Sequence, residues 1–390
     1  MKRFISFFLS VLLCFSLSPN ATATNTTSSF PIDRILAQNA INSADFALSF
    51  VANLYPGTNW CAGNVITIYN ENDAVGGFCI DIINGTQKNG YVVVKFANNE
   101  PVVSEFCIEP NVNNPFTEII EQVGIDNNSL RYYSIGPNDY HILDNSKNIV
   151  IGIDKKSVST AKFNEYKRQA QISQTELMRQ VESRTSSSEE DFIVYSGLDG
   201  YSVISNVYTG TKTAGYTIAG ATNISYYDTD DVDNNEYIYA CSLVALSNLM
   251  KYYRSIGFSN IDSDFQTVYS ELWAYAGTNT DGGTATGNIA PAAEDYLADQ
   301  GYNCSASTCI PTFFSTFTNA LDADNPCTLS YGATFNGIEA GHTVFVVGHV
   351  TTTEYKYLKV ADGWNSSLRF INYNGYNYSY RVATTFSLAE

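Results

Sequence analysis

Residues 240–253 read Ala-Cys-Ser-Leu-Val-Ala-Leu-Ser-Asn-Leu-Met-Lys-Tyr-Tyr, and this stretch decides how the chain is interpreted. From Cys241 to about Tyr253 the run is strongly apolar and contains no glycine or proline. It predicts a buried central helix whose first residue lies at the rim. A thiol attacks a carbonyl carbon only as the thiolate, and its pKa falls at a helix N-terminus beside an imidazolium. We expect Cys241 to be such a nucleophile; the alternative is a core or disulfide-bonded cysteine.

The base for this thiol must come from three histidines. His141 lies in the first half of the chain, away from the other candidate residues. His342 and His349 are seven positions apart on one expected strand, so their side chains face opposite sides of it. Only one of the two can therefore point at the thiol.

A hairpin expected from residues 342–350 and 355–361 favours His342 over His349. Its register places His342 opposite Asp362 and the two residues that follow. A carboxylate there would give a base its tautomer and orientation. His349 would face tyrosines, with no acid opposite it.

These segments resemble the streptopain-like peptidases of the papain class and, more loosely, the bacteriocin-leader-processing peptidases. Residues 240–253 look like the nucleophile helix of that family, and Gly341-His-Thr-Val-Phe-Val-Val-Gly348 looks like its histidine strand. Asp362-Gly-Trp364 stands where such enzymes carry Asn or Asp, one residue, then Trp. Residues 282–303 resemble the glycine-rich loop and helix that line the family's cleft. The resemblance spans about 120 residues of the second half.

The resemblance implies roles for individual residues and also shows departures. It implies that Cys241, His342 and Asp362 are catalytic, and that Trp364 shields the His-Asp hydrogen bond from water; Trp364 could equally be a core aromatic. The family expects a glutamine shortly before the cysteine as an oxyanion donor. Asn235 is the candidate substitute here, with a shorter side chain. Ser242 replaces the family's more usual small apolar residue.

The first half predicts a second unit with its own core. Residues 35–54 have helical spacing, residues 63–108 read as an antiparallel meander of four strands, and residues 157–184 form the clearest helical stretch. Residues 89–106 resemble a strand pair of the streptopain propeptide, which implies an inhibitory domain. The fold class expected is α+β: an antiparallel-sheet-plus-helix propeptide domain, then a papain-like domain with a central helix against an antiparallel sheet.

Four segments follow from this interpretation: a signal peptide at 1–23, a propeptide domain at 24–185, a linker at 186–192 and a peptidase domain at 193–390. The first has two basic residues, an apolar run and an Ala21-Thr-Ala23 cleavage site, which indicates export. No later run reaches the roughly 20 apolar residues of a membrane helix. Cys14 as a lipid-attachment site is the alternative. We expect an extracellular protein without membrane attachment.

Charge narrows the range of partners. The formal net charge of −18 argues against nucleic acid, which requires a surface of lysine and arginine. The acidic loop from Asp228 to Glu236 lacks the spacing and the glycine of an EF-hand, so no metal or other cofactor is expected. We expect this loop and the basic helix at 157–184 to attract each other.

The function predicted is a secreted cysteine endopeptidase made as a zymogen, activated by removal of the first domain. Its partners would be polypeptide substrates and its own propeptide domain. Two alternatives stay open: a binding protein that keeps the fold without turnover, and a transglutaminase-like thiol acyltransferase.

Overall fold

The computed structural model describes ten stretches of the chain: residues 31–125, 130–136, 138–183, 192–198, 202–232, 239–280, 282–310, 312–335, 338–375 and 380–389. The expected signal peptide, Asn235 and nearly all of the expected linker lie outside these residues. Within them, no helix combines the length and the apolar character needed to cross a membrane.

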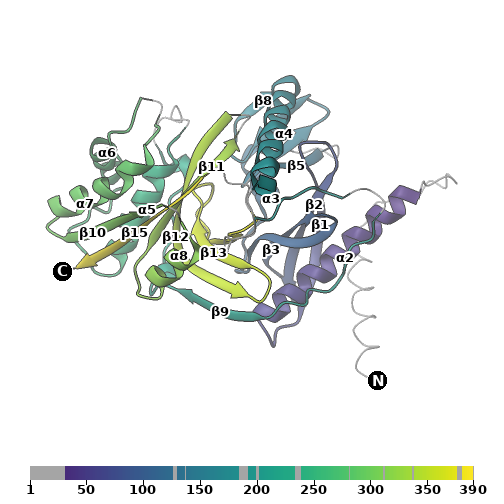
Figure 1. The fold of residues 1–390 in the computed structure, drawn as a ribbon, viewed down its shortest axis with the longest axis horizontal. Helices are drawn as coiled ribbons and strands as arrows, with labels where there is room; N and C mark the ends of the chain where they lie inside the picture. Colours follow the sequence, from purple (N-terminus) through teal and green to yellow (C-terminus); the bar gives the residue numbers. More distant parts are fainter. Residues whose placement is uncertain are drawn as a thin grey trace.

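Helix α2 (Pro31–Leu54) covers one face of the first-half sheet, whose strands form the meander expected from the sequence (Figure 1). These strands are β1 (Trp60–Tyr69), β2 (Val75–Asn84), β3 (Gln87–Ala97) and β4 (Glu100–Cys107). Each pairs antiparallel with the next. Asn98 and Asn99, both with positive φ, form the turn between β3 and β4, where the short polar side chain of asparagine tolerates the left-handed region.

The rest of the first half adds two helices and four short strands, of which only α4 was expected from the sequence. They are α3 (Pro115–Val123), β5 (Leu130–Gly136), β6 (Asp139–Asp144), β7 (Ile149–Gly152), β8 (Ser157–Ser159) and α4 (Thr160–Ser183). Helix α4 is the helical stretch expected at 157–184.

Helices α5 (Cys241–Ser255), α6 (Phe265–Ala276) and α7 (Ile289–Asp299) of the second half pack on one another beside its strands (Figure 1). Its helical elements are η2 (Ala221–Asn223), η3 (Thr229–Asp231), α5 (Cys241–Ser255), α6 (Phe265–Ala276), η4 (Thr286–Asn288), α7 (Ile289–Asp299) and α8 (Phe314–Leu321). Its strands are β9 (Lys212–Thr217), β10 (Asn303–Cys309), β11 (Cys327–Phe335), β12 (Ile338–Thr352), β13 (Lys356–Ala361), β14 (Arg369–Asn372) and β15 (Arg381–Ala389).

Helix α5 is the central helix that its apolar sequence predicts. Leu243, Val244, Leu246, Leu249 and Met250 are fully buried, and the helix lies against β12. A helix that is apolar nearly all round has to lie inside the protein. Its first residue is thereby held at one end of the second-half core.

A single hydrogen-bonded sheet runs through both halves, in the order β10-β15-β11-β12-β13-β14-β4-β3-β2-β1-β5-β6-β7-β8, with β9 paired to β12. The halves join where β14 pairs antiparallel with β4. Phe370 of β14 and Phe106 of β4 are paired there, and their rings stack with centroids 4.6 Å apart. This mixed helix-and-sheet architecture confirms the α+β class.

The predicted hairpin is present: β12 pairs with β13, with Phe345 opposite Ala361 and a bulge between Val346 and Gly348. Continuing that register brings His342 level with the residues just after β13. The sequence analysis predicted this juxtaposition.

One ion pair links the acidic loop to the region of the basic helix. Lys155 pairs with Asp230, but Lys155 lies in the turn before β8 rather than in α4. Lys167, within α4, binds Asp73 of the first half instead. In the described part of the acidic loop, the ion pair seen is this one, and its lysine lies outside the helix.

Candidate active site

Cys241 is the first residue of α5, and its thiol is free. Ala240, at the N-cap, gives the helix no side-chain cap, so backbone N–H groups of the first turn are left available there. Aligned peptide dipoles make this end of a helix partly positive, which stabilises a thiolate.

The thiol lies beside the imidazole of His342 on β12. Burial raises the pKa of the Cys241 thiol, but a hydrogen bond with His342 and the charge of that imidazole outweigh it, so the pKa is lowered. The backbone of Thr343 and the side chain of Ser242 contribute in the same direction. In its protonated form the thiol donates to the main-chain oxygen of Gly341, at 3.8 Å. The structure therefore joins the two residues that the sequence analysis selected as nucleophile and base.

Ser242 takes part in a chain of buried hydroxyl contacts that the sequence did not reveal. Its hydroxyl lies 2.9 Å from the hydroxyl of Thr343, which in turn lies 3.0 Å from that of Ser330. All three side chains are buried. This chain of hydroxyls fastens the first turn of α5 to β12 and β11, and so holds Cys241 next to His342.

His342 is oriented by a main-chain carbonyl. Its Nε2 lies 2.8 Å from the backbone oxygen of Asp362. A carbonyl oxygen only accepts, so Nε2 must carry a proton. In the neutral ring the remaining nitrogen, Nδ1, then has the lone pair. That nitrogen is the one left to take the proton of Cys241.

The carboxylate of Asp362 forms contacts other than the one expected. Its Oδ2 pairs with Nε of Arg369 at 3.0 Å, and its Oδ1 accepts the backbone N–H of Trp364 at 3.0 Å. Asp362 is fully buried, and burial raises the pKa of its carboxyl although the charge of Arg369 lowers it. Asp362 thus adjoins the imidazole through its backbone oxygen, whereas the sequence led us to expect its carboxylate at this contact.

Two aromatic rings enclose the imidazole. The indole of Trp364 is parallel to it, with an interplanar angle of 2° and centroids 5.2 Å apart. The ring of Tyr331 on β11 meets it edge-on, with centroids 5.5 Å apart. Trp364 therefore lies where a shield against water has to lie, and Tyr331 is a neighbour that the sequence analysis missed.

A residue of the first half reaches this enclosure. Asn138, between β5 and β6, is 1% exposed and donates from Nδ2 to the hydroxyl of Tyr331 at 3.4 Å. Its φ of 52° is in the left-handed region, which asparagine tolerates in tight turns. The first half thus contacts the hydroxyl of the tyrosine whose ring borders His342.

The other two histidines lie in separate environments. His349 pairs with Asp322, just after α8, at 2.9 Å, whereas the residue opposite it on β13 is Leu358, so no acid lies opposite it in the hairpin. The sequence analysis considered only the opposite strand, and this acid comes from a helix end. His141 pairs with Asp139 at 2.7 Å within β6 of the first half. The oxyanion candidate Asn235 lies outside the described residues.

A free thiol at a helix N-terminus beside an imidazole of fixed tautomer defines a nucleophilic thiol site. Residues 221–385 match the model of the family described as "Peptidase_C39 like family". This match includes Cys241, His342 and Asp362 and supports a cysteine peptidase, while covering less than half of the chain. The α+β fold is compatible with a papain-like cysteine peptidase.

One solved structure with some similarity is the Pseudomonas avirulence protein AvrPphB. The two chains are 15% identical, the match covers 44% of this chain and 100% of that one, and the TM-score is 0.22. So distant a likeness supports no statement about this protein. A search of curated proteins found no match.

Proposed function

We propose that this protein is a secreted cysteine endopeptidase of the streptopain-like kind, made as a zymogen whose first half restrains the active site. The observation that carries the catalytic part is the contact between Cys241 and His342, which lowers the pKa of the thiol. The other thiols for which a shift is resolved have raised pKa values because of burial: Cys79, Cys107, Cys304 and Cys327.

In the proposed cycle the Cys241 thiolate attacks the peptide carbonyl carbon, and the C–N bond breaks as His342 protonates the leaving amine. A water deprotonated by His342 then cleaves the acyl-thioester and releases the acid product. The backbone N–H of Cys241, at the uncapped start of α5, is a suitable donor to the oxyanion. We propose Asn235 as the second donor. Asp362 orients His342, and Trp364 keeps water from their hydrogen bond.

The zymogen part is supported by the contacts of the first half with this region. Asn138 donates a hydrogen bond to the hydroxyl of Tyr331, and Glu105 and Glu118 reach the arginine that binds Asp362. Export is inferred from residues 1–23, and activation would remove residues 24–185 by cleavage near the linker at 186–192.

Incubating the purified full-length chain with a reducing agent and mapping new N-termini by mass spectrometry tests the proposal. The wild-type chain is expected to cleave itself between the halves, and Cys241→Ala is expected to stay intact. His342→Ala and His349→Ala form a matched pair of histidine variants, of which only the first should abolish cleavage. Equal processing of wild type and Cys241→Ala would contradict the proposal.

A further inference from the structure

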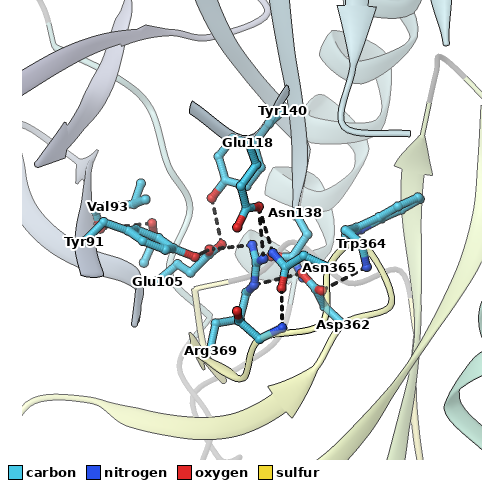
Figure 2. Close-up of polar contacts among 12 residues, drawn as sticks. Tyr91, Val93, Glu105, Glu118, Asn138, Tyr140, Asp362, Trp364, Asn365 and Arg369 are labelled. Carbon is cyan, nitrogen blue, oxygen red and sulfur yellow. Dashed lines mark hydrogen bonds and ion pairs between the residues drawn. The ribbon is translucent and has the colours of Figure 1, made fainter. Parts of the chain in front are cut away.

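A buried arginine lies at the junction of the two halves and contacts Asp362, the first residue of the turn at 362–364 beside His342. Arg369, the first residue of β14, is 1% exposed. Its Nε lies 3.0 Å from Oδ2 of Asp362, its Nη1 lies 3.1 Å from Oε1 of Glu105 on β4, and its Nη2 lies 3.9 Å from Oε2 of Glu118 on α3. Figure 2 shows the guanidinium between these carboxylates.

Every group facing this guanidinium is itself held in place. Tyr91 and Tyr140 donate their hydroxyls to Glu105, and Asn365 donates its amide to Glu118 at 2.8 Å. One buried cation thus faces three acidic groups, and burying such a set is costly unless its geometry is good. Burial raises the pKa of Asp362 and of Glu118, while Arg369 lowers both. Arg369 is therefore the counter-ion of the Asp362 carboxylate.

The Asp362 carboxylate determines the shape of the turn that holds His342. The carboxylate oxygen that does not face Arg369, Oδ1, accepts the backbone N–H of Trp364. This hydrogen bond closes the turn over Gly363, whose φ is +81°. From the same turn, the main-chain oxygen of Asp362 binds Nε2 of His342, and the indole of Trp364 stacks on the imidazole. Two of the contacts that orient the imidazole therefore come from one turn, and Arg369 holds that turn through its ion pair with Asp362.

We propose that Arg369 is a positioning residue of the active site. By holding the Asp362 carboxylate it fixes the turn at 362–364, and through this turn it sets the orientation of His342 toward Cys241. The inference rests on the proposed function, since the orientation of His342 has a catalytic meaning only if His342 serves the thiol. Arg369 itself touches neither the thiol nor the imidazole in any contact described above.

The test is the pH profile of Cys241 alkylation by iodoacetamide in the full-length chain, followed by mass spectrometry of the Cys241 peptide. Alkylation reports the thiolate without requiring turnover. In Arg369→Gln we expect alkylation at pH 6 to fall about tenfold, equivalent to one pKa unit. A wild-type profile in this variant overturns the proposal.

Glu105→Gln is the matched control, because it disturbs the same buried cluster and the same arginine but leaves the pair between Arg369 and Asp362. It should lower the unfolding temperature, as we also expect for Arg369→Gln, and keep alkylation at pH 6 within about twofold of wild type. An equal loss of alkylation in Glu105→Gln overturns the proposal, since the effect would then come from general loosening.

A second variant decides the matter if Arg369→Gln does not fold. Asp362→Asn breaks the same ion pair from the other side and keeps the main-chain carbonyl, so it should reproduce the loss of about tenfold. No change in Asp362→Asn overturns the proposal. Failure of the proposed function looks different: the wild-type chain itself would then alkylate like an ordinary thiol.

Discussion

The imidazole of His342 is held at Nε2 by a backbone oxygen of Asp362, 2.8 Å away. A backbone oxygen fixes the tautomer as well as a carboxylate oxygen does, but it carries no full negative charge and survives replacement of the side chain. The role of Asp362 at this contact is therefore geometric, and its carboxylate serves the turn and Arg369.

This geometry predicts a mild phenotype for Asp362→Asn. We expect kcat for peptide hydrolysis to fall by about tenfold, whereas an aspartate whose carboxylate holds the base costs about 10⁴-fold when changed to asparagine. Steady-state kinetics of the activated enzyme measure this. A loss near 10⁴-fold would show that the carboxylate acts directly on His342.

For single residues of the candidate site, the sequence was informative where neighbouring positions in the chain carry the pattern. Cys241 could be proposed because it begins an apolar helix that resembles the family's nucleophile helix, and His342 because the expected hairpin places it opposite Asp362. Arg369 could not be found, because its partners Glu105 and Glu118 lie more than two hundred positions away, and nothing local marks a buried guanidinium. Whether Asn235 donates to an oxyanion stays a prediction.

Among the elements, the short η3 turn beside the active-site loop carries an unusual carboxyl group. Asp228 is its N-cap and accepts the N–H of Asp230 at 2.9 Å. Burial, and then the charge of Asp231, raise the pKa of Asp228 to about 6, although Lys155 opposes this. A raised folded-state pKa means that ionising Asp228 costs stability as the pH rises from about 4 to about 6.

Asp228→Asn should therefore stabilise the protein at neutral pH. Asparagine keeps the capping oxygen and removes the charge, so we expect the free energy of unfolding at pH 7 to rise by about 1 kcal/mol, after allowing for partial exposure. Urea unfolding at several pH values measures this, and the gain should vanish below about pH 4. A variant less stable than wild type at pH 7 would contradict the assignment.

Asp264→Asn is a control for which we expect the opposite change in stability at pH 7. Asp264 caps α6, and hydrogen bonds from Thr267 lower its pKa. Its ionised form contributes stability that is present above its unfolded pKa and is lost as the pH falls through the folded one. Replacing it should lower stability at pH 7 and have no effect in acid.

Helices and strands could be predicted from the sequence where the pattern of apolar and polar residues extends over many positions. The four strands of residues 63–108, the helix at α4 and the helix at α5 all appear close to their expected bounds. Strands β5, β6, β7 and β14 were not assigned, because four to seven residues are too few for the alternation to stand out from neighbouring turns.

At the scale of the whole molecule, the two halves share a sheet and an apolar core. The ladder between β14 and β4 joins them, and Tyr357 and Phe370 of the second half lie in one buried cluster with Phe50 and Phe106 of the first. Buried apolar contacts respond little to salt, in contrast to exposed ion pairs. The ion pair of Lys155 with Asp230 is partly exposed and is the salt-sensitive kind.

We therefore expect the halves to stay together after a cut between Ser183 and Phe192, so that this cut alone would not complete the removal of the first half that we propose for activation. On size-exclusion chromatography the two pieces should elute as one species, both at low salt and at about 1 M NaCl, where the Debye length is only about 3 Å. Lys155→Ala should not separate them. Dissociation at high salt would show that charge attraction, rather than the shared core, holds the first half in place.

The pairing of β4 with β14 could not be foreseen, because it joins strands from different halves of the chain, and pairing between such distant strands leaves no mark in the local sequence pattern. The division into a propeptide domain and a peptidase domain stays a prediction, since the expected linker lies almost entirely outside the described residues.

The central claim is that Cys241 is a thiolate stabilised by His342. Ultraviolet absorbance of the thiolate, recorded against pH as the difference between wild type and Cys241→Ala, tests it most directly, because the subtraction removes the other cysteines. The account predicts a difference signal already present at pH 6 that disappears only on further acidification. A signal that first rises near pH 8.5, as for an ordinary cysteine, would contradict it.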